Sequence, residues 1–157
     1  QRMDDESWYL GTADAVYQNL DILRAHRPDY ILVLAGDHIY KMDYAELIAD
    51  HVALGKKCTV ACIEVPIAEA SAFGVMAIDP MRQIVEFVEK PKNPAVIASL
   101  VLGGNARARL SDKSDTPYCL ASMGIYLFSG KVMREALADP AQTDFGKEVI
   151  PGLLASN

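Results

Sequence analysis

The stretch ILVLAGDHIY, Ile31 to Tyr40, decides the fold expected for this chain. Its first half, Ile31 to Ala35, is an unbroken apolar run, which is typical of a strand buried on both faces of a helix-covered parallel sheet. Gly36 then allows the backbone to turn or a ligand to come close. Asp37 follows at the carboxyl end of the strand, the edge at which open α/β sheets bind ligands. We hypothesise that Asp37 holds a divalent metal against a phosphate; the alternative is that it only caps a turn.

The composition is that of an ordinary globular protein, with 157 residues, 51% of them hydrophobic and 23% charged, and it predicts one domain. The 15 basic and 21 acidic residues give a net charge of −6, so we expect no nucleic-acid partner. No apolar run approaches the roughly 20 residues that span a bilayer, so we expect no membrane partner. No secretory leader pattern opens the sequence, which indicates a cytoplasmic protein.

The three cysteines, Cys58, Cys62 and Cys119, are odd in number and lie among apolar residues. The sequence contains no C-x-x-C pair, and its three histidines show no metal-ligand spacing. We therefore expect buried, reduced thiols, with neither a disulfide nor a zinc site.

Helical and strand patterns alternate along the chain, which indicates an α/β fold. Because two of the strands are joined by a connection short enough for a hairpin, the sheet is expected to be mixed, mostly parallel and flanked by helices. The expected helices are one from an N-cap at Thr12 to before Pro28, then Tyr44 to Leu54, Val96 to Leu102, Lys131 to Leu137, and a segment from Asp144 interrupted by Pro151. The expected strands are Ile31 to Ala35, Lys57 to Val65, Phe73 to Asp79, Ile84 to Glu89, and Leu120 to Phe128.

Two acidic positions, Asp37 and Asp144, are candidates for a magnesium site, because a pair of carboxylates can hold Mg²⁺ whose other ligands are waters and phosphate oxygens. Phosphoryl or nucleotidyl transfer needs little more from protein side chains than positioning and charge neutralisation. An attacking phosphate oxygen is already ionised near neutral pH, since its second pKa is ~6. No Ser-His or Cys-His pair is required for such chemistry.

Three further positions each have two interpretations. Lys90, beside Glu89 at the end of a strand, is either a point charge for a phosphate or half of a solvated ion pair. Gly74 either gives a sugar access to the backbone or marks a bulge. Ser122, inside an apolar strand, either bonds a sugar hydroxyl or is a small core residue.

Seven motifs occur in a characteristic order: WYLGTADAV, LAGDHIYKMDY, CTVACIEVP, SAFGVMAID, FVEKP, ASMGIYLF and DFGKEVIP. Together they closely resemble the glucose-1-phosphate adenylyltransferase (ADP-glucose pyrophosphorylase) family, especially the bacterial glycogen-type enzymes, from about Trp8 to Pro151. FVEKP and a strand ending in Gly-Asp recur across sugar nucleotidyltransferases. GTADAV, GDHIY, SAFGVM and DFGKEVIP are specific to the ADP-glucose branch.

The resemblance implies a Rossmann-like nucleotide-diphospho-sugar transferase domain. It implies transfer of an adenylyl group from ATP to α-D-glucose 1-phosphate, with Mg²⁺, giving ADP-glucose and pyrophosphate. By motif match, Asp37 would be the catalytic metal-binding aspartate and Asp144 its metal-binding partner, and Lys90 would hold the sugar phosphate. The substrate-binding positions implied around them are Tyr9, Gly11, Gly74, Glu89 and Ser122.

This sequence departs from the family pattern in three respects. The family's Gly-rich nucleotide loop and first strand are absent, and so is its C-terminal left-handed β-helix domain. The stretch Val101 to Ser114 looks inserted. We therefore expect residues 1–157 to be a partial catalytic domain, truncated at the N-terminus, inactive alone and with an unprotected sheet edge; the full-length protein is expected to be a homotetramer. Two alternatives remain: a nucleotidyltransferase for another sugar 1-phosphate or nucleotide, and a non-catalytic regulatory subunit.

Overall fold

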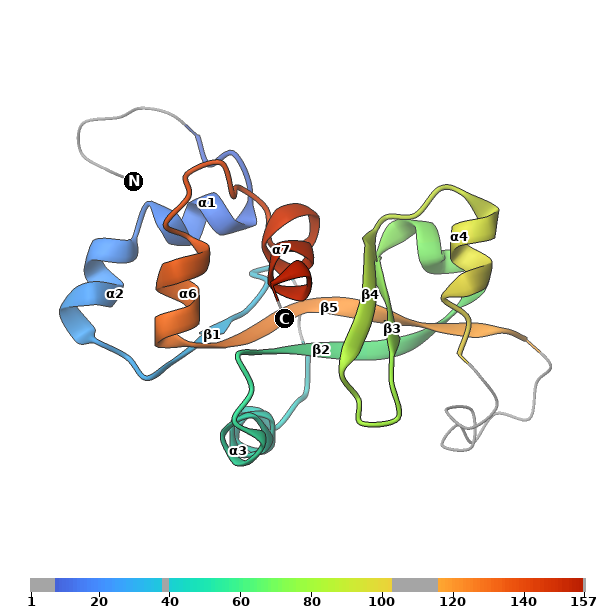
Figure 1. The fold of residues 1–157 in the computed structure, drawn as a ribbon, viewed down its shortest axis with the longest axis horizontal. Coiled ribbons are helices and arrows are strands. Elements are labelled where there is room, and N and C mark those ends of the chain that lie inside the picture. Colours follow the sequence, from blue (N-terminus) through green and yellow to red (C-terminus); the bar gives the residue numbers. More distant parts are fainter. Residues whose placement is uncertain (1–7, 38–39, 103–115, 157) are drawn as a thin grey trace. The chain divides into compact units, whose positions relative to one another are not determined.

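The computed structural model describes residues 8–37, 40–102 and 116–156, and it confirms the α/β class (Figure 1). The chain divides into two compact units, the first made of Gln1–Ala61 with Gly124–Val149 and the second of Cys62–Met123 with Ile150–Asn157. Each unit is described by itself. Among the described residues, the helices are all too short or too polar to cross a membrane.

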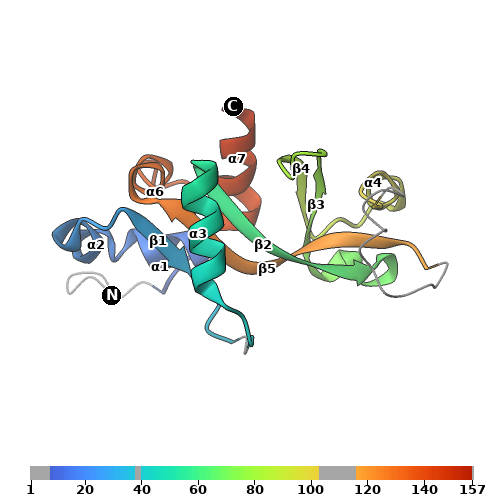
Figure 2. The same cartoon turned by 90° about the horizontal axis from the view of Figure 1, so that it is seen from below.

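The first unit places helices on both sides of a short strand. Its elements are α1 (Thr12–Tyr17), α2 (Leu20–His26), β1 (Tyr30–Val33), α3 (Tyr44–Leu54), α6 (Gly130–Ala136) and the π-helical turn η2 (Phe145–Val149). Helices α1 and α6 lie on one side of β1 and α3 lies on the other, where it is seen in front of the strand in Figure 2 (Figures 1 and 2). The strands β2 (Cys58–Pro66) and β5 (Tyr118–Ser129) each contribute residues to both units.

The strand β1 pairs with β5 in an antiparallel register that runs from Tyr30 opposite Ser129 to Val33 opposite Tyr126. On the α3 side, the ring of His51 packs edge-on against Tyr30 with centroids 5.4 Å apart. Helix α3 has the predicted bounds because Asp43 caps its first turn, accepting a hydrogen bond from Ala45 N–H at 2.9 Å, and left-handed Gly55 ends it.

The second unit is built on a hairpin. It contains the 3-10 helix η1 (Ile67–Ala72), β3 (Gly74–Ile78), β4 (Ile84–Glu89), α4 (Pro94–Ser99) and α7 (Ile150–Ala155). Strands β3 and β4 pair antiparallel, as predicted, and β3 also pairs antiparallel with β5. Its core gathers small and aliphatic side chains from η1 and several strands, namely Val65, Ala70, Val75, Leu100, Cys119 and Ala121.

The strand directions differ from the sequence expectation. The three pairings whose register can be followed in the described chain are all antiparallel, so the prediction of a mostly parallel sheet is wrong for these pairs. An apolar run shows that a strand is buried but does not show the direction of its neighbours. The predicted α/β class, with a sheet flanked by helices, is confirmed.

Several element boundaries also needed correction. Thr12 is not an N-cap: it is the first residue of α1, after Gly11. The predicted single helix is two, because Asn19 leaves the helical conformation and its side-chain amide donates to the carbonyl of Ala15 at 2.8 Å. The C-terminal segment changes beside Pro151 from the π-helical turn η2 to α7, of which Pro151 is the second residue, so the chain stays helical past the proline.

The three cysteines are free, but of the predicted buried thiols only Cys119 is fully buried; Cys58 is half-buried and Cys62 is exposed. Burial raises the pKa of the Cys58 thiol to about 12, which keeps it protonated at neutral pH. Most of the suspected insertion, Val101 to Ser114, lies outside the described residues; within the described part, Val101 forms a bridge with Cys119, and Leu102 N–H donates to the carbonyl of Tyr118 at 2.9 Å.

Candidate active site

In the second unit, three of the predicted substrate-binding residues form a row across neighbouring strands. Gly74 on β3 lies opposite Glu89 on β4. On the other side of β3, Val75 lies opposite Ala121, so the next position of the same register places Ser122 opposite Gly74. Residues directly opposite each other share a face of a sheet. Glu89, Gly74 and Ser122 therefore lie side by side on one face, which we call the glycine row.

A side chain at the centre of the glycine row would not fit. A Cβ atom built on Gly74 would lie 2.6 Å from both Glu89 Oε2 and Phe87 Cζ. The carboxylate of Glu89 thus reaches over the bare backbone of Gly74, and its side chain keeps 20% of its exposure. Ser122 is buried, at 9% exposed. The row offers a carboxylate acceptor and a hydroxyl, a set that suits the hydroxyl groups of a sugar.

Lys90 follows the row where β4 ends. Its backbone is left-handed, with φ 46°, and its N–H donates to the carbonyl of Phe73 at 2.9 Å, so the chain turns sharply as it leaves the strand. The Lys90 side chain is 60% exposed, and its Nζ lies 3.9 Å from Glu89 Oε1. That separation is beyond hydrogen-bonding distance, and so loose a pair contributes little to stability. The ammonium group can therefore move onto a phosphate at small cost.

In the first unit, Asp37 lies in an exposed turn shortly after β1. The strand ends sooner than predicted, at Val33 and not at Ala35. Asp37 is therefore not held in the core, and it extends from the carboxyl end of β1, as the sequence indicated.

Asp144 has a structural task of its own. Its Oδ1 accepts hydrogen bonds from the N–H groups of Gly146 and Lys147, at 2.9 and 3.0 Å, and so caps the helical turn η2. In return, Oε2 of Glu148 accepts from the N–H groups of Thr143 and Asp144, at 2.7 and 2.8 Å. Hydrogen bonds from Asp144 and then Thr143 lower the pKa of Glu148, which stays ionised. This reciprocal arrangement fixes the backbone at Asp144 and leaves its second oxygen, Oδ2, for a ligand.

Phe145, the residue after Asp144, packs this segment against β5 through its aromatic ring. Phe145 is fully buried, and its ring lies 5.3 Å from that of Tyr126 and 5.5 Å from that of Phe128, centroid to centroid. Tyr126 is in turn the partner of Val33, the last residue of β1. Asp37 and Asp144 are thus both attached to the carboxyl end of β1, one through the chain and the other through aromatic packing.

Gly11 packs against the same segment. A Cβ atom on Gly11 would collide with the carbonyl oxygen of Thr143, which accepts hydrogen bonds from Ala13 and Asp14 N–H at 2.9 and 3.0 Å. The glycine is needed for this close approach, so its role beside a substrate phosphate stays a prediction. Tyr9, two residues earlier, is 47% exposed.

Comparisons with known proteins show the family of the chain. The sequence profile described as "Nucleotidyl transferase" matches residues 1–157. The chain belongs to the nucleotidyl transferase family. It is 53% identical over 161 residues to a protein of Albidiferax ferrireducens named glucose-1-phosphate adenylyltransferase, an alignment that covers 99% of this chain and 34% of that relative. The chain thus spans about a third of the length of the curated relative it matches.

The donor set of this nucleotidyl transferase suits magnesium better than a transition metal. Within the described part of the chain, no three His, Cys, Asp or Glu side chains cluster as a complete cage. Mg²⁺ does not need such a cage, because it keeps several waters and is bound through one or two carboxylates and the substrate's phosphates. Asp37 and Asp144 supply only oxygen ligands, so they fit that ion.

Sequence reasoning missed two residues that support the site. Asp14 is buried, and its Oδ2 accepts from Leu10 N–H at 2.8 Å and from Gln18 Nε2 at 2.9 Å. It thereby holds the turn that carries Tyr9 and Gly11. Glu148 was not among the predicted residues. It lies four residues after the capping Asp144, close to the usual capping-box spacing, and that spacing could have indicated its role.

Proposed function

We propose that the full-length protein containing this chain transfers an adenylyl group from ATP to α-D-glucose 1-phosphate, giving ADP-glucose and pyrophosphate. The family membership and the relative named glucose-1-phosphate adenylyltransferase support this reaction class and substrate. The observation that carries the proposal is the glycine row of Glu89, Gly74 and Ser122, with Lys90 at its end. Its chemistry matches a sugar that bears a phosphate.

In this proposal the second unit binds glucose 1-phosphate. Glu89 accepts hydrogen bonds from glucose hydroxyl groups, Ser122 contributes its own hydroxyl, and the missing side chain at Gly74 lets the Glu89 carboxylate reach across the row. Lys90 neutralises charge on the phosphate as a point charge. Together these contacts hold the phosphate in one orientation, which is the main contribution a protein makes to such a transfer.

The first unit contributes the carboxylates. Asp37 and Asp144 would hold Mg²⁺, which when bound supplies charge neutralisation for the phosphates of ATP. A phosphate oxygen of glucose 1-phosphate attacks the α-phosphorus of ATP, and the bond from that phosphorus to the β-phosphate's bridging oxygen breaks. Pyrophosphate leaves with the bonding electrons. No base is needed, because the attacking oxygen is already ionised at neutral pH.

We place this activity in glycogen biosynthesis, in the cytoplasm, and propose that the full-length protein is a homotetramer. Each of these follows from the motif resemblance and needs its own test. Fractionation, and mass measurement of the purified protein by light scattering, address the location and the oligomer.

The direct test is an assay of the purified full-length protein with Mg²⁺, ATP and glucose 1-phosphate, detecting ADP-glucose and pyrophosphate in equal amounts. Parallel reactions replace ATP by the other nucleoside triphosphates and glucose 1-phosphate by the galactose and mannose 1-phosphates. Preferred use of ATP and glucose 1-phosphate supports the proposal. A higher kcat/KM with another pair would reassign the substrate, and tight binding of both substrates without turnover would indicate a regulatory subunit.

A further inference from the structure

Two segments of the first unit that lie far apart in the sequence are joined by hydrogen bonds beside Asp144. The carbonyl of Thr143 accepts from two backbone N–H groups in the first turn of α1, at 2.9 and 3.0 Å. In the opposite direction, the hydroxyl oxygen of Thr12 accepts from the N–H of Phe145 at 3.3 Å. The turn that carries Gly11 is therefore attached to both chain neighbours of Asp144.

Glu148 holds the other side of this junction. Its Oε2 accepts hydrogen bonds from Thr143 N–H at 2.7 Å, from Asp144 N–H at 2.8 Å and from the Thr143 hydroxyl at 3.2 Å. Hydrogen bonds to an ionised acceptor are about twice as strong as those between neutral groups. A single carboxylate oxygen thus fixes the backbone at two consecutive residues.

The peptide group between Thr143 and Asp144 connects the two sets of contacts. Its N–H donates to Glu148, and its C=O accepts from α1. A peptide group is planar, so its N–H and C=O cannot turn independently. A shift at Glu148 is therefore passed on both to Asp144 and to the start of α1. We call Thr12, Thr143 and Glu148 the clamp.

The clamp also decides how the carboxylate of Asp144 is oriented. Its Oδ1 accepts from the N–H groups of Gly146 and Lys147, at 2.9 and 3.0 Å. These bonds form only while the backbone at Asp144 keeps its place at the start of η2, which Glu148 secures. With Oδ1 held in the cap, the direction of Oδ2 is fixed as well. Partners that orient a metal ligand in this way typically change metal affinity or activity by about 10- to 100-fold when removed.

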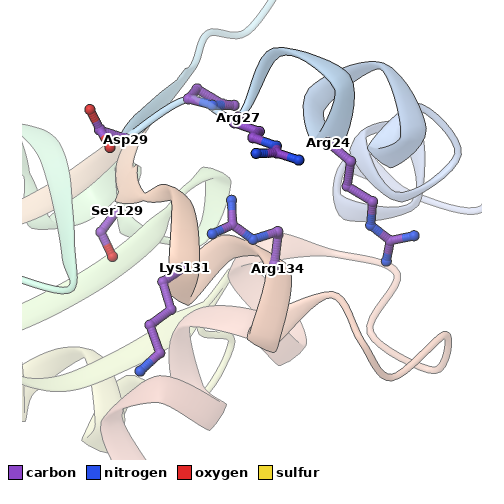
Figure 3. Close-up of a pocket in the computed structure, with 7 residues that line it drawn as sticks. Arg24, Arg27, Asp29, Ser129, Lys131 and Arg134 are labelled. Atoms are coloured by element: carbon purple, nitrogen blue, oxygen red, sulfur yellow. The ribbon is translucent and has the colours of Figure 1, made fainter.

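The orientation of Asp144 does not come from a preformed cavity. The pocket of about 460 Å³ in the same unit lies where the end of α2 meets the start of α6, and neither Asp144 nor any clamp residue lines it (Figure 3). Like charges repel, so a pocket with mainly cationic walls does not suit Mg²⁺. Among its lining residues, Asp29 is the only carboxylate, beside the cations Arg24, Arg27, Lys131 and Arg134.

We propose that Glu148 is a positioning residue for the metal, which acts through the clamp to hold Asp144 Oδ2 in place beside the Gly11 turn. The proposal rests on the proposed function, since it takes Asp144 as a ligand of Mg²⁺. The competing role for Glu148 is that of a third metal ligand. The three hydrogen bonds that end on Oε2 favour positioning, because they already use that oxygen.

The test measures Mn²⁺ binding to the full-length protein, from the electron paramagnetic resonance signal of the free ion, with and without ADP-glucose. Glu148→Ala removes the acceptor, whereas Glu148→Gln keeps an oxygen that can accept the same hydrogen bonds but removes the charge. Glu148→Ala is also made in the Asp144→Asn background. Glu135→Ala, at an exposed carboxylate of α6, is the matched control.

We expect Glu148→Ala to weaken Mn²⁺ binding about 10- to 100-fold and to lower kcat, while Glu148→Gln stays within about threefold of wild type. Glu135→Ala should bind as wild type does. In the Asp144→Asn background, Glu148→Ala should have no further effect on Mn²⁺ binding, because it acts through Asp144. Unchanged binding in folded Glu148→Ala, equal losses in the alanine and glutamine variants, or additive losses with Asp144→Asn would each overturn the proposal.

Thr12 provides a second pair of variants if Glu148→Ala does not fold. Thr12→Ser keeps the hydroxyl that accepts from Phe145, and Thr12→Val replaces it with a methyl group of similar size. Thr12→Val should bind Mn²⁺ more weakly than Thr12→Ser, and equal affinities would contradict the clamp. A wild type that binds Mn²⁺ through Asp144 but makes no ADP-glucose would overturn the proposed function alone. A wild type that binds no Mn²⁺ would overturn the role of Glu148.

Discussion

The two units position their candidate residues in different ways. In the second unit, Glu89, Gly74 and Ser122 are aligned by the register of three strands, and backbone pairing sets their places whatever side chains they carry. In the first unit, Asp144 and Gly11 are held by contacts that they make themselves, a helix cap and a close approach to Thr143. Strand register therefore sets the places of the residues in the glycine row, whereas Asp144 and Gly11 are positioned by their own hydrogen bonds and packing.

The largest effect is expected at Asp37, which lies in an exposed turn after β1 and is the proposed catalytic ligand of the metal. Asp37→Asn keeps the size of the side chain but removes its charge. We expect kcat to fall roughly a hundred- to a thousandfold or more, with a change in unfolding free energy below about 0.5 kcal/mol. Steady-state kinetics and thermal unfolding of the full-length protein check both values.

Asp43→Asn is the matched control for this change. Asp43 is also exposed, but it caps α3, and asparagine caps a helix as well as aspartate does. Its activity should stay within about twofold of wild type. Equal losses in the two variants would remove the special role of Asp37.

The next effect is expected at the centre of the glycine row. Gly74→Ala puts a methyl group within 2.6 Å of Glu89 Oε2 and Phe87 Cζ, so one or both side chains must move. Overpacking of this kind costs about 1–3 kcal/mol, and displacement of Glu89 should raise KM for glucose 1-phosphate. Gly36→Ala is the stability control, since no atom lies within 4 Å of its added methyl. If Gly74→Ala were as stable and active as wild type, the row would not be as crowded as described.

Two variants of Asp144 separate its role as the cap of η2 from its proposed role as a metal ligand. Asp144→Asn keeps an oxygen that can cap η2 but removes the charge, so stability should persist while activity falls. Asp144→Ala removes both, and should cost a further ~1 kcal/mol of unfolding free energy. Chemical denaturation of both variants gives the comparison. Full activity in a folded Asp144→Asn protein would leave Asp144 with only its structural task.

The smallest effect concerns pH. His51 is 1% exposed, its Nδ1 lies 2.8 Å from Thr59 Oγ1, and burial lowers its pKa. Its neutral form is therefore favoured in the folded state, and the stability this gives is complete above about pH 6.5 and is lost as the pH falls through the lower folded-state pKa.

Melting temperatures of wild type and His51→Gln between pH 7.5 and 5 test the histidine's contribution. Wild type should lose more stability than His51→Gln as the pH falls. His26→Gln, at an exposed histidine, controls for loss of one imidazole. If the melting temperatures of wild type and His51→Gln fell in parallel with pH, His51 would not contribute to the pH dependence of stability.

The sequence allowed local structure to be predicted where local chemistry decides it. Helix α3 was predicted to the residue because a capping Asp43 and a terminal Gly55 mark both ends. The break between α1 and α2 was missed, because Asn19 could continue a helix or bond back to Ala15, and only the folded chain shows which.

The candidate site was predictable as a set of residues but not as an arrangement. Motif matches named Gly74, Glu89 and Ser122, yet the row depends on a strand register between residues 48 apart in sequence, which no local pattern encodes. The same holds for the link from Asp144 through Phe145 and Tyr126 to β1. Apolar periodicity predicts which side chains are buried, not which ones meet.

The central claim is that the glycine row with Lys90 receives glucose 1-phosphate, and the most direct test is the pair of KM values in Lys90→Gln. We predict that KM for glucose 1-phosphate rises about 10- to 100-fold, while KM for ATP stays within about twofold. Lys92→Gln, an exposed lysine two residues along, should change neither value. An equal rise in both KM values, or no rise in either, would contradict the account.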